Sequence, residues 1–102
     1  MTHDFMFGSE KSAYNALVNY VNLPNATEDD FNHVTNKIDI AKEEAAIAMN
    51  RLSHSSYYRG VVDDFCAMEE RRDAWIRVAN SIQYNISGRS ALAIIKETFN
   101  VR

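Results

Sequence analysis

The residues best placed to do chemistry in this chain are His33 and Asp30, which lie three positions apart on a predicted helix. This spacing puts an imidazole and a carboxylate on one helix face, where both could bind a metal ion. A two-metal helical bundle, however, needs several carboxylates and Glu-x-x-His pairs that point inward from facing helices. The pair points outward and has no matching set, so we expect no metal ion and no other cofactor.

Cys66 is the only cysteine, which excludes an intrachain disulfide and favours a reducing compartment. A nucleophilic cysteine needs a nearby base, and the segment predicted to face it, residues 41–45, contains no histidine. His3 beside the N-terminal amine could hold copper or nickel; the alternative is a solvated side chain in a tail. We expect no enzymatic activity, because the chain also lacks a Gly-rich phosphate loop and a serine nucleophile elbow.

Charged and aromatic side chains are densest over residues 69–75, which include Glu69, Arg71, Arg72 and Trp75. Arg and Trp are frequent at protein-binding hot spots, so this segment is a predicted contact surface, although charge runs more often form a solvated helix face. Arg72 interrupts the apolar pattern of its helix. It either sets the helix register or extends along its neighbours to reach water.

A second predicted contact surface is the segment Tyr57, Tyr58 and Arg59, between two predicted helices. Two adjacent tyrosines cannot both face the core, so at least one is expected to be exposed.

Composition limits the classes of partner. The net charge is −3, with 11 basic and 14 acidic residues, whereas proteins that grip nucleic acid carry a basic face. The first residues lack a positive segment followed by an apolar run, and nothing approaches a membrane span. We expect a cytoplasmic protein that binds neither nucleic acid nor a membrane.

The fold predicted for residues 1–102 is one all-α domain, because three glycines and one proline leave few breaks. Helices are expected over about 9–23, 27–53 and 57–86, and from Ser90 onward, with Ser9 as the first N-cap and residues 1–8 as a flexible tail. Residues 27–30 resemble a capping box, with Thr27 and Asp30 as its two members. Residues at spacings of three and four, all apolar except Arg72, mark one seam on each long helix: Phe31, Val34, Ile38, Ala41, Ala45, Ala48 and Leu52, then Tyr58, Val61, Phe65, Met68, Arg72, Trp75, Ala79, Ile82 and Ile86.

Two consecutive seams joined by a few residues predict a long antiparallel αα-hairpin, from about Phe31 to Ile86, within a bundle of about four helices. Folding the chain at residues 54–56 sets Ala45 near Phe65 and Ala41 near Met68. Large side chains therefore face small ones, as dense packing requires.

The outer faces of this hairpin are unusually apolar. Ile40 and Ile47 recur seven residues apart on the first long helix, and Ala67 and Ala74 do so on the second. Either the two shorter helices cover these stripes, or one stripe stays open and binds another protein or a second copy. The second case would make the chain a homo-oligomeric structural or adaptor protein.

The stretch from Trp75 to Ile82, with Ala93 and Ile94 further on, resembles part of the small phage-encoded anti-CRISPR proteins that act on type I-E systems. The similarity covers about a quarter of the chain and consists of apolar residues at helical spacing. It implies a compact helical inhibitor, without catalytic activity, that binds and blocks a bacterial defence or DNA-processing protein in the host cytoplasm.

Overall fold

Four α-helices make up the structure, a computed structural model that describes residues 3–53, 59–84 and 88–101. They are α1 (Gly8–Asn22), α2 (Glu28–Ser53), α3 (Arg59–Gln83) and α4 (Gly88–Thr98). Over these ranges the chain forms no strand beyond one isolated β-bridge, which confirms the predicted all-α class. None of the helices has the length and apolar character needed to cross a membrane, as judged over the same residues.

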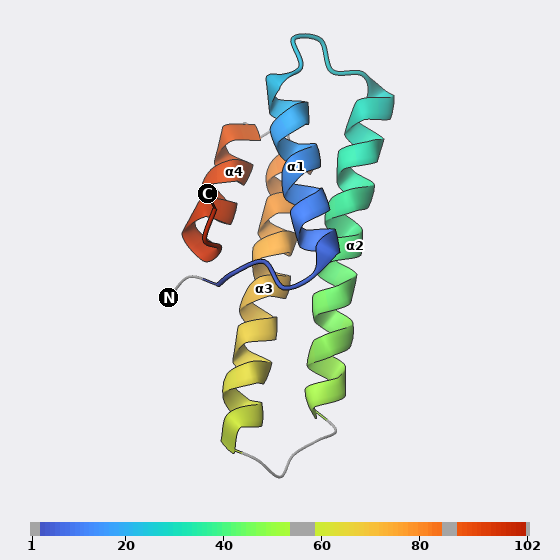
Figure 1. The fold of residues 1–102 in the computed structure, drawn as a ribbon. Coiled ribbons are helices and arrows are strands. Elements are labelled where there is room, and N and C mark those ends of the chain that lie inside the picture. The colour runs from blue at the N-terminus through green and yellow to red at the C-terminus, as the bar shows by residue number, and fades with distance from the viewer. Residues whose placement is uncertain (1–2, 54–58, 85–87, 102) are drawn as a thin grey trace.

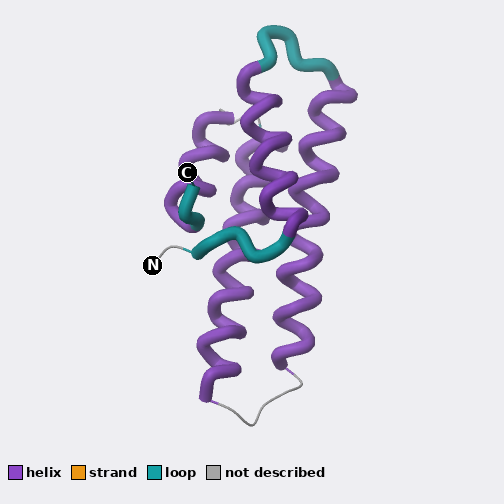
Figure 2. The backbone as a smooth tube through the Cα atoms, viewed as in Figure 1, coloured by secondary structure: helices purple, strands orange, loops and turns teal. Residues whose placement is uncertain are grey.

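The long helices α2 and α3 lie side by side and antiparallel, which confirms the predicted hairpin (Figure 1). The shorter α1 contacts both α2 and α4, and α4 also contacts α3. Figures 1 and 2 show that α1 and α4 cover only the end of the hairpin near the α1–α2 loop. The other end extends beyond them, which gives the molecule its elongated shape of 51 × 23 × 22 Å.

The N-terminus of α2 is capped by its own side chains, as the sequence predicts. The Thr27 backbone N–H donates to Asp30 Oδ2 at 2.9 Å, and the Asp30 backbone N–H donates to Thr27 Oγ1 at 3.2 Å. This reciprocal capping box satisfies donors that the first helical turn leaves unpaired. The bonds to Thr27 stabilise the ionised carboxylate and lower the pKa of Asp30, an effect to which His33 adds slightly.

Three other helix ends differ from expectation. The N-cap of α1 is Phe7, not Ser9, because the carboxylate of Glu10 reaches back and accepts the backbone N–H of Phe7. Helix α3 ends at Gln83, three residues early, and α4 begins at Gly88 rather than after Ser90. Boundaries of this kind depend on local capping contacts that hydrophobic spacing does not encode.

The core runs along the predicted seam of α2, where Val34, Ile38, Ala41 and Ala45 are fully buried. Helix α3 buries a wider stripe than its predicted seam, because it packs against both α2 and α4. From residue 64 onward, where the side chains of α3 are described, its buried residues are Met68, Arg71, Ala74, Trp75, Val78, Ser81 and Ile82. Helices α1 and α4 complete the core with Ala13, Leu17, Ala91 and Ile95, and Phe99 directly follows α4.

Residues 3–7, expected to belong to a flexible tail, instead pack across the bundle beside the end of the chain. The His3 backbone N–H donates to the Thr98 carbonyl at 2.8 Å, and the Asn100 N–H donates to the His3 carbonyl at 2.8 Å. The centres of the Phe5 and Phe99 rings lie 5.0 Å apart. Backbone pairing and aromatic packing together hold this segment in place.

The fully buried position of Ala45 yields a first prediction. An Ala45→Glu substitution would place a charge and a longer side chain at a position that is 0% exposed and occupied by an alanine. We expect it to lower the free energy of unfolding by more than about 3 kcal/mol, measured by chemical denaturation followed by circular dichroism. The matched change Ala93→Glu, at an exposed position of α4, should leave stability nearly unchanged. Equal effects at the two positions would contradict the observed packing.

The capping box yields a second prediction. Because the pKa of Asp30 is lowered from 3.8, its ionised form stabilises the folded state above that pH, and this contribution disappears as the pH falls through the lower folded-state pKa. The difference in melting temperature between the wild type and Asp30→Asn should therefore shrink below about pH 3.8. Asp29→Asn removes the same charge without touching the bonds to Thr27 and serves as the control. A difference that persists unchanged into acid would refute this linkage.

Candidate protein-binding surface

The charged and aromatic segment over residues 69–75 does not form one surface. Trp75 is 0% exposed and Arg71 only 4%, so the prediction that these two residues contact a partner is wrong. Their side of α3 faces the bundle, where α4 packs. Glu69 is exposed, and the Arg72 side chain remains 29% exposed.

Arg71 and Trp75 bind a single buried carboxylate, that of Glu10 on α1, which is 0% exposed. Arg71 Nη1 donates to Glu10 Oε1 at 2.8 Å, and Trp75 Nε1 donates to Oε2 at 3.1 Å. The backbone N–H groups of Met6 and Phe7 also donate to Oε1, at 2.9 and 3.2 Å. Four donors therefore converge on one carboxylate, about as many as its oxygens accept.

Aromatic packing encloses this ion pair. The guanidinium carbon of Arg71 lies 5.5 Å from the centre of the Phe99 ring, a cation–π arrangement. The centre of the Phe99 ring in turn lies 5.5 Å from the centre of the Trp75 ring. The Glu10 cluster, defined as Glu10, Arg71, Trp75 and Phe99, thus joins α1, α3 and the end of α4.

Sequence analysis missed the Glu10 cluster because Glu10 and Arg71 are separated by 61 positions. One signal was present, since Glu10, Ala13 and Leu17 follow each other at spacings of three and four, and all three are fully buried. A glutamate in line with an apolar stripe must find a partner, because an unpaired buried charge is too costly.

We call four residues of α3 that keep contact with water, Glu69, Arg72, Ile76 and Asn80, the α3 face. They follow each other at spacings of three and four, so they share one side of the helix. Ile76 is 37% exposed. The Arg72 guanidinium pairs with its neighbour Asp73 at 3.0 Å, so of its two alternatives the structure favours an extension toward water.

The two apolar stripes of the hairpin have different fates. On α3, Ala74 is only 2% exposed and Ser81, seven residues further on, 7%, because α4 packs on this side, whereas Ala67 is half-buried. On α2, Ile40 and Ile47 are 42% and 47% exposed. We call Ile40 and Ile47, together with the charged residues Lys37 and Glu44 beside them, the α2 face.

The predicted contact residues at the tip of the hairpin are outside what the structure describes. Tyr57 and Tyr58 lie outside the described residues, and Arg59 is the first residue of α3, with its side chain outside the description. These three residues stay predictions.

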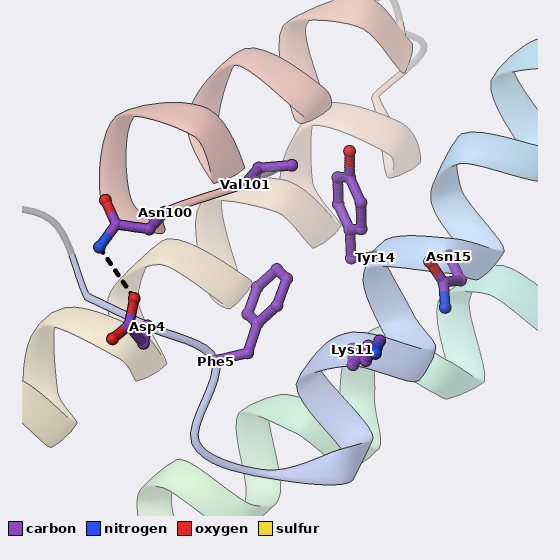
Figure 3. A pocket seen from close by; sticks show the side chains of 7 residues that line it. All are labelled: Asp4, Phe5, Lys11, Tyr14, Asn15, Asn100 and Val101. Atoms are coloured by element: carbon purple, nitrogen blue, oxygen red, sulfur yellow. Dashed lines mark hydrogen bonds between the residues drawn. The ribbon is translucent and has the colours of Figure 1, made fainter.

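Figure 3 shows a pocket of about 520 Å³ between the N-terminal segment, α1 and the end of the chain. Its walls combine the rings of Phe5 and Tyr14, 5.6 Å apart, with polar side chains at the rim. Asn100 Nδ2 donates to Asp4 Oδ1 at 2.9 Å across one edge. This bond joins the N-terminal segment to the residues that follow α4, so this edge of the pocket has a structural role.

Over residues 3–53, 59–84 and 88–101, no three or more His, Cys, Asp or Glu side chains gather in a group that could hold a metal ion. Cys66 is exposed on α3. His3 pairs with Glu70 through its Nε2 atom, which ties the N-terminal segment to α3.

No protein-family model, curated protein or solved structure was found to match this chain. Its function is therefore inferred from its own residues.

The Glu10 cluster yields a third prediction. Glu10→Ala leaves the Arg71 guanidinium buried without its counter-charge and frees two backbone donors, so we expect a loss of about 3–5 kcal/mol in unfolding free energy. Glu97→Ala is the matched control, because Glu97 also pairs with an arginine, Arg77, but both side chains are mostly exposed. A Glu10→Ala protein as stable as the Glu97→Ala protein would show that the buried pair does not hold the bundle together.

Proposed function

We propose that this chain is a non-enzymatic protein-binding module that inhibits a bacterial defence or DNA-processing protein by occupying its working surface. The host cytoplasm is where such an inhibitor would meet its target. The observation that carries this proposal is the exposure of three isoleucines, Ile40, Ile47 and Ile76, on hairpin faces that α1 and α4 leave open.

Exposed isoleucines on a helical hairpin support binding for an energetic reason. Each side chain fully removed from water contributes about 1.5–3 kcal/mol. Little conformational entropy is lost on binding, because α2 and α3 are already packed against each other. The Glu10 cluster and the N-terminal segment add rigidity at the covered end. A pre-organised surface binds with less entropic cost than a loop.

The α3 face has the composition of a contact surface for the partner. Ile76 supplies an apolar centre, and Arg72 and Glu69 supply opposite charges beside it. Arginine is enriched at binding hot spots, and flanking charges of both signs select a partner by complementarity.

The resemblance of residues 75–82 to type I-E anti-CRISPR proteins supports the choice of target class. Those residues lie on α3 and include Ile76 of the α3 face. A type I-E effector protein is therefore the first partner to test.

The fourth prediction concerns this activity. Purified chain mixed with the type I-E effector complex should form a stoichiometric assembly on size-exclusion chromatography, and its expression should restore phage growth on a host with an active type I-E system. Ile76→Glu should weaken the assembly at least tenfold, because it places a charge at the centre of the contact. Ala93→Glu introduces the same side chain on exposed α4 and should bind like the wild type.

The outcomes separate the parts of the proposal. Capture of a different bacterial protein, in a fixed ratio and sensitive to Ile76→Glu, would retain the binding module and reject the type I-E target. If no protein binds the wild type in preference to the Ile76→Glu variant, the proposed function is wrong.

A further inference from the structure

The α2 face carries charges in an order that complements itself. Ile40 is its midpoint, with Lys37 three positions before and Glu44 four positions after. At about 100° per residue, Ile47 lies about 20° from Ile40, and both Lys37 and Glu44 lie about 40–60° away on the opposite flank. Within the described residues neither Lys37 nor Glu44 forms an ion pair in its own chain. Both charges therefore remain available to a partner.

We propose that the α2 face binds a second copy of this chain, as an antiparallel helix pair whose two-fold axis passes beside Ile40. A two-fold contact is self-complementary, so a residue on one copy meets its counterpart at the same distance on the other side of the axis. Ile40 then contacts Ile40 of the second copy. Lys37 lies opposite Glu44 of the second copy on the same flank, and this ion pair occurs twice.

The same register also brings compatible residues together further from the axis. His33 lies seven residues before Ile40 and Ile47 seven residues after, so each Ile47 meets His33 of the second copy. No like charges meet along this pairing.

The nearest competing register is disfavoured by charge. If Ile40 lay opposite Ile47 of the second copy, the axis would fall between Glu43 and Glu44. Four carboxylates would then gather at the centre of the contact, where like charges facing each other are destabilising. Charge order thus selects one arrangement of the two copies.

The dimer is expected to be reversible rather than obligate. Helix α2 has 26 residues and is about 39 Å long. The area buried by one pair of helices of this length is expected near the lower end of the roughly 1,200–2,000 Å² typical of stable interfaces. The inference rests on the proposed function only in assigning the hairpin's outer faces to protein contacts. The α3 face stays open in this dimer, so each dimer could hold two partners.

Cysteine cross-linking of the full chain, in a Cys66→Ala background, tests the register. Ile40→Cys should form a disulfide-linked dimer under mild oxidation, because the two positions meet at the axis. Ile47→Cys alone should not, since its two copies lie about 21 Å apart along the helices. His33→Cys combined with Ile47→Cys should restore cross-linking. Failure of Ile40→Cys to exceed Ile47→Cys would overturn the register.

Light scattering over a range of concentrations tests the charge pairing. The wild type should shift from monomer toward dimer, and Lys37→Glu or Glu44→Lys should each raise the dimer dissociation constant about tenfold. The double exchange, Lys37→Glu with Glu44→Lys, should restore wild-type affinity. Circular-dichroism melts verify that each variant is folded.

A monomeric mass at every concentration, or no rescue by the double exchange, would overturn the dimer. A monomer whose Ile40→Glu variant loses the host partner would assign the α2 face to that partner instead, which rejects the dimer but leaves the proposed function intact. Conversely, a dimer with the predicted cross-links and no host partner would retain this inference and reject the proposed function.

Discussion

The carboxylate of Glu10 is the point at which the separate parts of this small bundle meet. The apolar surface of a two-helix hairpin does not by itself fix the positions of two short helices and an extended N-terminal segment. Glu10 fixes them, because its oxygens accept hydrogen bonds from Arg71 and Trp75 on α3 and from the backbone of residues 6 and 7. The Glu10 side chain ties α1 to α3 in this way, and the packing of Phe99 on Trp75 brings the end of α4 against the same site.

A buried ion pair is weak evidence for net stability, because desolvation of both charges offsets their attraction. Its stronger effect here is on specificity of arrangement. The four donors around Glu10 have fixed directions, and an apolar contact of the same size would tolerate sliding of α1 along the hairpin. The N-terminal segment adds a second directional tie through the backbone pairing of His3 with residues 98 and 100.

The placement of α1 and α4 determines which surfaces stay available. Both short helices gather at one end of the hairpin and on one side of it (Figure 1), so the small-residue stripe of α3 is used for packing. Ile40 and Ile47 of α2 and Ile76 of α3 remain in contact with water. A hairpin with one covered side and two partly apolar outer faces has the geometry of an adaptor: one face can serve self-association while the other serves a partner of different composition.

The sequence by itself determined the all-α class, the hairpin, the buried seam of α2 and the cap formed by Thr27 and Asp30. These features depend on residues within one or two helical turns of each other, and a 3.6-residue period records them directly. Only the tertiary structure decided that Arg71 and Trp75 turn inward, that residues 3–7 pack on the end of the chain, and that the stripe of α3 is covered while that of α2 is open. The first two outcomes depend on groups separated by about 60 or more positions, as with Glu10 and Arg71 or His3 and Thr98. The third depends on where the short helices dock on the hairpin. Spacing along the chain carries no information on which distant helix will satisfy a buried charge.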